Sequence, residues 1–101
     1  MEKNKINKIA TYVGFAIKSN HIVFGAENLS NVNKKLYLIL KDTAAGNNLN
    51  KIAERVASRT QCNIYNFTSE DLFKMTNIKE VKVIGIKNKS LSDAIEKIIK
   101  E

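Results

Sequence analysis

Few side chains of this 101-residue chain have the types and spacing that catalysis needs. The single histidine, His21, stands beside a short apolar run, and we interpret it as a packing or surface residue rather than a base. The single cysteine, Cys62, has no histidine near it, so a buried structural thiol is favoured over a nucleophile. One cysteine and one histidine cannot supply the clustered ligands of a metal site. We therefore expect no enzyme, no metal and no cofactor.

Phosphate-binding loops are equally poorly represented. Neither G-x-G-x-x-G nor G-x-x-x-x-G-K-[ST] occurs in the sequence. Residues 42–47 contain one glycine before an expected helix start, where backbone N–H groups can bind an anion. An ordinary strand-to-helix connection is the preferred interpretation of this segment.

Charge is the first feature that points to a partner. The chain has 17 Lys and Arg against 10 Asp and Glu, and the net charge of +7 is spread along it. This excess favours a polyanionic partner, most simply a nucleic acid. Only Arg55 and Arg59 are arginines, and lysine lacks the guanidinium fork that reads base edges. The charge therefore predicts attraction to phosphates rather than readout of sequence.

Length and composition predict one packed domain over residues 1–101. The hydrophobic fraction of 44% is enough for a core, and the length is that of a single small domain. No apolar run reaches the roughly 18 residues of a membrane helix, and we identify no secretory signal. A single cysteine fits a reducing cytoplasm, which is the expected location.

The apolar periodicity predicts helices and strands that alternate. In chain order we expect a helix over 4–19, a strand over 22–24, at most a short helix within 26–33, a strand over 35–40, a helix from Asn47, a strand over 63–67, a short helix after Thr68, a strand over 81–86 and a last helix from Ser90. The continuous apolar run at 35–40 is typical of a strand covered on both faces. The alternation predicts an α/β layered domain with a mostly parallel or mixed sheet.

A more specific pattern begins at Gly14 and runs to Asp42. It has the form G-x-A-x-K followed by I-V-x-G, and its matching residues are Gly14, Ala16, Lys18, Ile22, Val23 and Gly25. The pattern resembles the L-seven-Ae/L-thirty-e superfamily of ribosomal, kink-turn RNA-binding proteins, most closely its small bacterial YlxQ-type members. Asn20 and His21 stand where that family usually has Gly and Lys. The resemblance implies a three-layer α/β/α sandwich with a central four-stranded mixed sheet, which binds a kinked RNA helix at one end.

The resemblance implies a first RNA-contacting piece at the start of the second helix, where the family has G-x-N-E-x-x-K. Here Gly25 matches the glycine, Glu27 and Asn28 occupy the Asn-Glu pair in inverted order, and Asn31 replaces the lysine. Backbone N–H groups and short polar side chains at a helix start can bind guanine edges and phosphates. The replaced residues are expected to weaken this binding. The alternative is that Glu27 and Asn28 only cap a short helix.

A second implied piece is the loop before the last strand. Its candidate residues are Lys74, Met75, Thr76, Asn77, Ile78 and Lys79. Met75, Thr76 and Ile78 are expected to cap an extruded nucleotide, and Asn77 to substitute for a glycine. Under the family fold, Lys74, Lys79 and Lys82 are expected to form one basic rim with Lys34 and Lys35. The alternatives are that Met75 packs under the loop and that the lysines form a solvated face.

The leading hypothesis is a monomeric RNA-binding module that recognises kink-turn or similarly bent RNA, ribosomal RNA included, and that is ribosome-associated. Membrane and DNA partners are not expected. The alternative is a protein-interaction or structural domain of the same fold that has lost specific RNA recognition. A small enzyme would require a deep pocket around His21, Asp42 and Cys62, and no acid, base or nucleophile cluster is visible in the sequence.

Overall fold

The computed structural model describes all 101 residues. The helices are α1 (Lys3–Lys18), α2 (Ala26–Asn31), α3 (Asn47–Thr60), α4 (Ser69–Thr76) and α5 (Lys89–Lys100). The strands are β1 (Ile22–Phe24), β2 (Leu38–Asp42), β3 (Asn63–Phe67) and β4 (Val83–Ile86). Every element expected from the sequence is present and in the expected order. None of the helices is both long and apolar enough to cross a membrane.

The four strands form one mixed sheet in the order β1-β4-β2-β3. Strand β4 is antiparallel to both of its neighbours, whereas β2 and β3 run parallel. In the register of the sheet, Leu40 lies between Ile84 on β4 and Tyr65 on β3. The expected four-stranded mixed sheet is confirmed.

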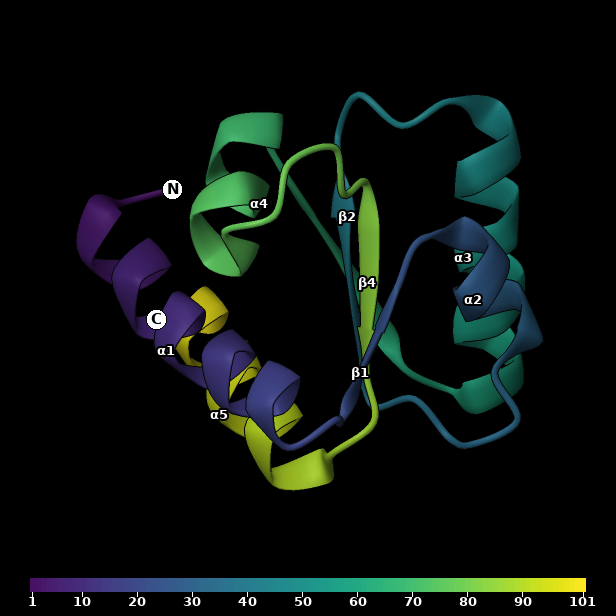
Figure 1. Cartoon of the computed structure of the whole chain (residues 1–101), viewed down its shortest axis with the longest axis horizontal. Coiled ribbons are helices and arrows are strands. Elements are labelled where there is room, and N and C mark those ends of the chain that lie inside the picture. Colours follow the sequence, from purple (N-terminus) through teal and green to yellow (C-terminus); the bar gives the residue numbers. More distant parts are fainter.

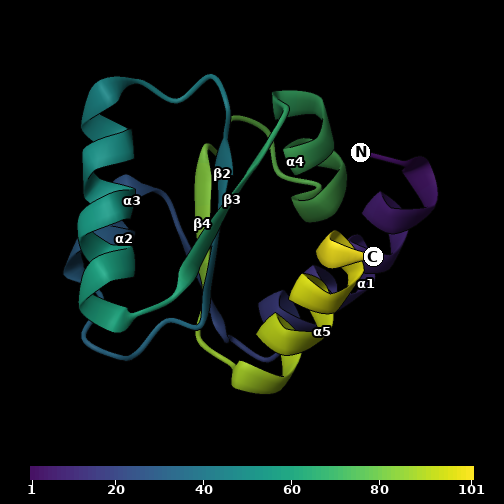
Figure 2. The ribbon, with the colours of Figure 1, turned by 180° about the vertical axis from the view of Figure 1, so that it is seen from behind.

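Helices cover both faces of the sheet, as Figures 1 and 2 show: α1, α4 and α5 lie on one face, and α2 and α3 on the other. Strand β2 serves both layers because successive side chains of a strand point to opposite faces. Leu38 and Leu40 belong to the larger core beneath α1, α4 and α5. Ile39 belongs to the smaller core beneath α2 and α3. The three-layer α/β/α sandwich is therefore confirmed, as is a strand covered on both faces.

Strand β2 begins and ends later than expected. The strand prediction over 35–40 followed the apolar run, but Leu36 is buried beside α2 and α3 without being part of the strand. Asp42, expected in a loop, is the last strand residue and is 2% exposed. A carboxylate can occupy this position because neighbouring donors satisfy its oxygens.

Capping residues set the helix boundaries. The Thr68 hydroxyl accepts a hydrogen bond from the backbone N–H of Asp71 at 3.1 Å, which confirms the expected start of α4. The Asn88 side chain accepts from the N–H of Leu91 at 2.9 Å, so α5 begins at Lys89 rather than at the predicted Ser90. Asn20, just after α1, has a φ of 59°, a left-handed conformation that asparagine tolerates at the end of a helix.

Candidate nucleic-acid interface

Gly25 joins strand β1 to helix α2 in a conformation that other residues rarely adopt. Its φ and ψ are 83° and 159°, a region open essentially to glycine alone. Its N–H donates to the carbonyl of Val83 at 3.0 Å, and its own carbonyl accepts from the N–H of Leu29 at 3.0 Å. The glycine thus ends one strand pairing and begins a helix within a single residue.

The polar residues of α2 face outward while Leu29 anchors the helix. Leu29 is fully buried in the core shared with α3. Glu27, Asn28 and Asn31 are exposed. The Asn28 side-chain amide donates to the carbonyl of Phe24 at 2.9 Å, so its N–H is partly committed to the protein, while its oxygen faces no protein donor. The Glu27 carboxylate has no protein partner and is free to accept hydrogen bonds from a ligand.

The segment 77–82 between α4 and β4 is held by two left-handed residues. Asn77 has a φ of 57° and ends α4, which confirms its expected role as a glycine substitute. Glu80 has a φ of 65°, and the sequence did not reveal this second turn. Between them, Ile78 is 38% exposed and Lys79 is exposed. The segment therefore presents one apolar and several charged side chains to solvent.

Met75 and Thr76 do not present surface to a ligand, so their expected contact with an extruded nucleotide is wrong. Met75 is 3% exposed and packs in the larger core. Thr76 is 4% exposed, and its hydroxyl donates to the carbonyl of Leu72 at 3.1 Å and accepts from the N–H of Ile78 at 3.2 Å. The physical reason is helical spacing, because Leu72, Met75 and Thr76 lie on the same inner face of α4. Of the three expected nucleotide contacts, only Ile78 is accessible.

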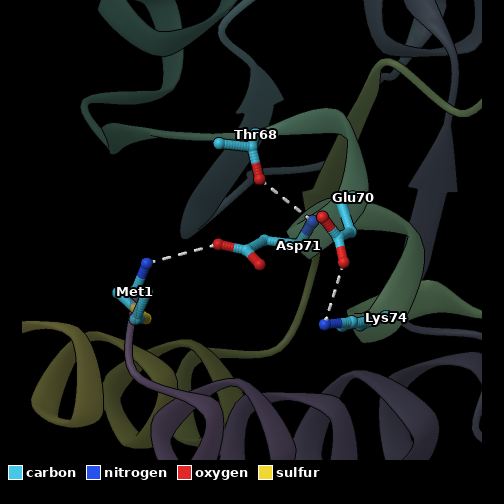
Figure 3. A network of polar contacts seen from close by, with 5 residues as sticks. All are labelled: Met1, Thr68, Glu70, Asp71 and Lys74. Atoms are coloured by element: carbon cyan, nitrogen blue, oxygen red, sulfur yellow. Dashed lines mark hydrogen bonds and ion pairs between the residues drawn. The ribbon is translucent and has the colours of Figure 1, made fainter.

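Lys74 belongs to a charged face of α4 rather than to the segment 77–82. Its ammonium lies 3.2 Å from the Glu70 carboxylate one turn earlier, as Figure 3 shows. In the same view Asp71 approaches the amino group of Met1 at 3.4 Å. An exposed pair of this kind contributes little stability. The alternative of a solvated face therefore describes Lys74.

Lys34 and Lys35 lie at the opposite end of the sheet from Gly25, so the expected basic rim is wrong. Gly25 bonds to Val83 at the start of β4, whereas Tyr37, just after the two lysines, donates to the carbonyl of Ile86 at its end. The lysines instead lie beside the last turn of α3. Strand β2 runs antiparallel to β4, so the residues before β2 lie at the end of β4, away from the segment 77–82 that precedes it.

The start of α2 adjoins the residues just before β4, which follow the expected loop residues 74–79. A surface hollow of about 370 Å³ is lined by Gly25 and Ala26 from the start of α2, by residues 80–82 before β4, and by Phe24 and Leu49. We call this surface the α2–β4 interface and define it as residues 25–28 and 77–82. Its charged side chains are Glu27, Lys79, Glu80 and Lys82. Lys82 was expected in the basic rim, whereas Glu80 was not among the expected residues.

Asp42 anchors this end of the sheet. Its carboxylate accepts from the Ser69 hydroxyl at 2.5 Å and from the N–H of Ala44 at 2.8 Å, and it lies 3.9 Å from the Lys82 ammonium. Burial opposes ionisation, but these hydrogen bonds and the charges of Lys82 and Lys41 outweigh it, so the pKa of Asp42 is lowered. The anionic carboxylate holds Lys82, itself 54% exposed, beside the hollow.

The thiol and the imidazole lie away from Asp42. Cys62 precedes the β3 residue that pairs with Leu38, and Asp42 pairs with Phe67 at the other end of that ladder. Burial raises the pKa of the Cys62 thiol, to which the Thr60 hydroxyl donates at 3.3 Å. The His21 ring contacts the Ser19 hydroxyl at 2.8 Å. No three potential metal ligands of the His, Cys, Asp and Glu types lie together.

No protein-family model matches the sequence, and no curated protein matches it either. Among solved structures, the chain is similar to a protein of unknown function from Bacillus halodurans. The TM-score is 0.80 at 21% sequence identity, and the alignment covers 93% of this chain and 98% of that one. At this identity the likeness shows a shared fold over essentially the whole domain.

Proposed function

We propose that this protein is an RNA-binding module that holds a kink-turn or similarly bent structured RNA, ribosomal RNA included, at the α2–β4 interface. The observation that carries the proposal is the junction of two separate segments, where the Gly25 N–H bonds to the Val83 carbonyl and both segments line one hollow. A bent RNA exposes base edges that a regular A-form helix hides, and such a hollow can receive them.

The chemistry of the interface supports the same proposal. Glu27 offers an unpaired carboxylate that can accept from guanine N1 and N2, and the Asn28 side-chain oxygen is a second acceptor beside it. Ile78 provides an exposed apolar contact for a base, and Lys79 and Lys82 provide charge for phosphates. The resemblance to the L-seven-Ae/L-thirty-e superfamily implies RNA contacts on two segments that overlap this interface, residues 25–31 and 74–79.

Replacement of Glu27 tests the proposal by the sign of its effect. If the carboxylate accepts hydrogen bonds from a base, Glu27→Ala weakens kink-turn RNA binding by about tenfold or more. If the protein only attracts phosphates, removing a negative charge strengthens binding instead. Glu54→Ala, which removes an exposed carboxylate from α3, is the matched control and is expected to leave binding unchanged or slightly tighter. Tighter binding by Glu27→Ala contradicts the proposal.

Protein docking is a second candidate function, favoured by one observation. A hollow of about 610 Å³ lies between α1 and α5, and in it Phe15 is 52% exposed beside Tyr12. A large exposed aromatic side chain is typical of protein interfaces. In that case Phe15→Asp removes a nuclease-resistant complex, and Glu27→Ala leaves it intact.

A further inference from the structure

A row of basic side chains runs along the exposed side of α3 that lies next to α2. Lys51, Arg55 and Arg59 recur every four residues, so they lie on one side of the helix, and all three are exposed. The row includes both arginines of the chain. None of the ion pairs in the structure involves these residues, so no carboxylate lies within ion-pair distance of them.

Both arginines point toward α2 and the segment after it. The Arg55 guanidinium donates to the Ser30 hydroxyl at 3.3 Å, and the Arg59 guanidinium donates to the Val32 carbonyl at 3.2 Å. A guanidinium has five N–H donors, so each keeps donors for a ligand while one bond to the protein fixes its position. A planar guanidinium group that the protein already holds in position is well suited to bind a phosphate group.

The row ends in a second hollow at the opposite end of the sheet from Gly25. This hollow, of about 350 Å³, is lined by residues 32–35 and 59–61, which lie together in Figures 1 and 2. Its charged side chains, Lys34, Lys35 and Arg59, are all positive. The ammonium of Lys35 lies 5.2 Å from the centre of the Tyr37 ring, which leaves Lys34 as the freer partner of Arg59. The partial negative charge of about half a unit at the end of α3 cannot offset these cations.

We propose that Lys51, Arg55, Arg59 and Lys34 form a basic ridge that binds the phosphodiester backbone of the RNA held at the α2–β4 interface. The proposal rests on the proposed function. Helix α2 is six residues long and rises about 9 Å, so an RNA stem lying along it reaches both hollows. Leu49, at the start of α3, lines the first hollow, and Arg59, near its end, lines the second. A linear row of fixed cations favours a phosphate chain over a single small anion.

The salt dependence of RNA binding tests the ridge. Each charge removed by Arg55→Gln, Arg59→Gln or Lys34→Gln is expected to weaken binding and to reduce the slope of log K against log salt by about 1. The same reduction is expected for kink-turn and duplex RNA, so the preference for the kink-turn stays unchanged. Lys8→Gln, an exposed lysine of α1 on the other side of the sheet, is the matched control and leaves the slope unchanged.

The outcomes separate the ridge from the proposed function. The wild-type preference for kink-turn over duplex reports on the α2–β4 interface, whereas the slope reports on the ridge with any RNA that binds. An unchanged slope in the ridge variants overturns the ridge, as does an equal change in Lys8→Gln. Binding of inorganic phosphate at Arg59 with an unchanged RNA slope also overturns it, because the site then takes small anions only. Arg59→Lys, which keeps the charge, is expected to restore the slope lost in Arg59→Gln.

Discussion

The backbone N–H of Gly25 donates to the carbonyl of Val83 at 3.0 Å. This bond joins the end of β1 to the start of β4, and it therefore holds the first turn of α2 beside the segment 77–82. The two segments are far apart in the chain and meet only because β1 pairs with β4. The α2–β4 interface is consequently a product of sheet order and of the backbone geometry at one glycine.

Replacement of Gly25 is expected to disturb both stability and RNA binding. The backbone region at φ 83° and ψ 159° costs a residue with a side chain about 1–3 kcal/mol, although nothing crowds the position of the new Cβ. Gly25→Ala should therefore lower the free energy of unfolding by that amount and weaken kink-turn RNA binding. Gly46→Ala is the control, because Gly46 also precedes a helix but has a φ of −75° and open space around it. Chemical denaturation and RNA titration of both variants check this, and equal effects would contradict it.

Gly85 sets how closely α2 approaches the sheet. A Cβ at this position would lie 2.8 Å from Cδ1 of Leu29 and 2.9 Å from Cδ1 of Leu36. Gly85→Ala is therefore expected to overpack this core and to destabilise the fold by about 1–3 kcal/mol. Gly14→Ala, in open space within α1, should instead stabilise it by about 0.5–1 kcal/mol. Thermal unfolding of the two variants measures the difference, and a neutral Gly85→Ala would show that the Leu29 and Leu36 side chains move aside without cost.

The hydrogen bond from Ser69 to Asp42 predicts a specific pH dependence of stability. The pKa of Asp42 is lower in the folded than in the unfolded chain. The contribution of its ionised carboxylate to the free energy of unfolding is therefore fully present above the ordinary Asp pKa of 3.8, and it is lost as the pH falls through the pKa of the folded chain. Removing the Ser69 hydroxyl brings the pKa of Asp42 in the folded chain closer to its pKa in the unfolded chain. Ser69→Ala should cost about 1–3 kcal/mol at neutral pH, and the difference from wild type should shrink below pH 3.8. Urea unfolding across pH tests this.

The control for that experiment is Ser90→Ala, at an exposed position in the first turn of α5. It is expected to leave the unfolding free energy unchanged at every pH. A Ser69→Ala deficit that stays constant from neutral to acid pH would mean that the hydroxyl stabilises the fold without acting on the ionisation of Asp42.

Replacement of Asn28 and replacement of Glu27 are expected to affect stability differently. The Asn28 amide donates to the Phe24 carbonyl at 2.9 Å, so Asn28→Ala should lower the free energy of unfolding by about 0.5–1.5 kcal/mol as well as weaken RNA binding. Glu27 makes no such bond, and Glu27→Ala should change binding alone. Denaturant unfolding of the two variants distinguishes them. Equal stabilities would show that the Asn28 bond is not formed in solution.

Local sequence patterns predicted the elements better than they predicted the site. The alternation of apolar runs was sufficient for the order of helices and strands, and Asn77 was correctly expected in the left-handed conformation. Packing of Met75 was one of the two alternatives, but the burial of Thr76 was missed, although its i+4 spacing from Leu72 would have indicated it. The position of Lys34 depends on the antiparallel pairing of β2 with β4, which no local pattern encodes.

The most direct test of the account compares a kink-turn RNA with a straight duplex of the same length and composition. Affinities are measured with the wild-type protein over a series of salt concentrations, because phosphate attraction weakens as salt rises whereas base contacts persist. We expect the protein to bind the kink-turn more tightly than the duplex by about tenfold or more, with a preference that survives at high salt. Equal affinities that fall together as salt rises would contradict it and leave only nonspecific attraction between a chain of charge +7 and RNA.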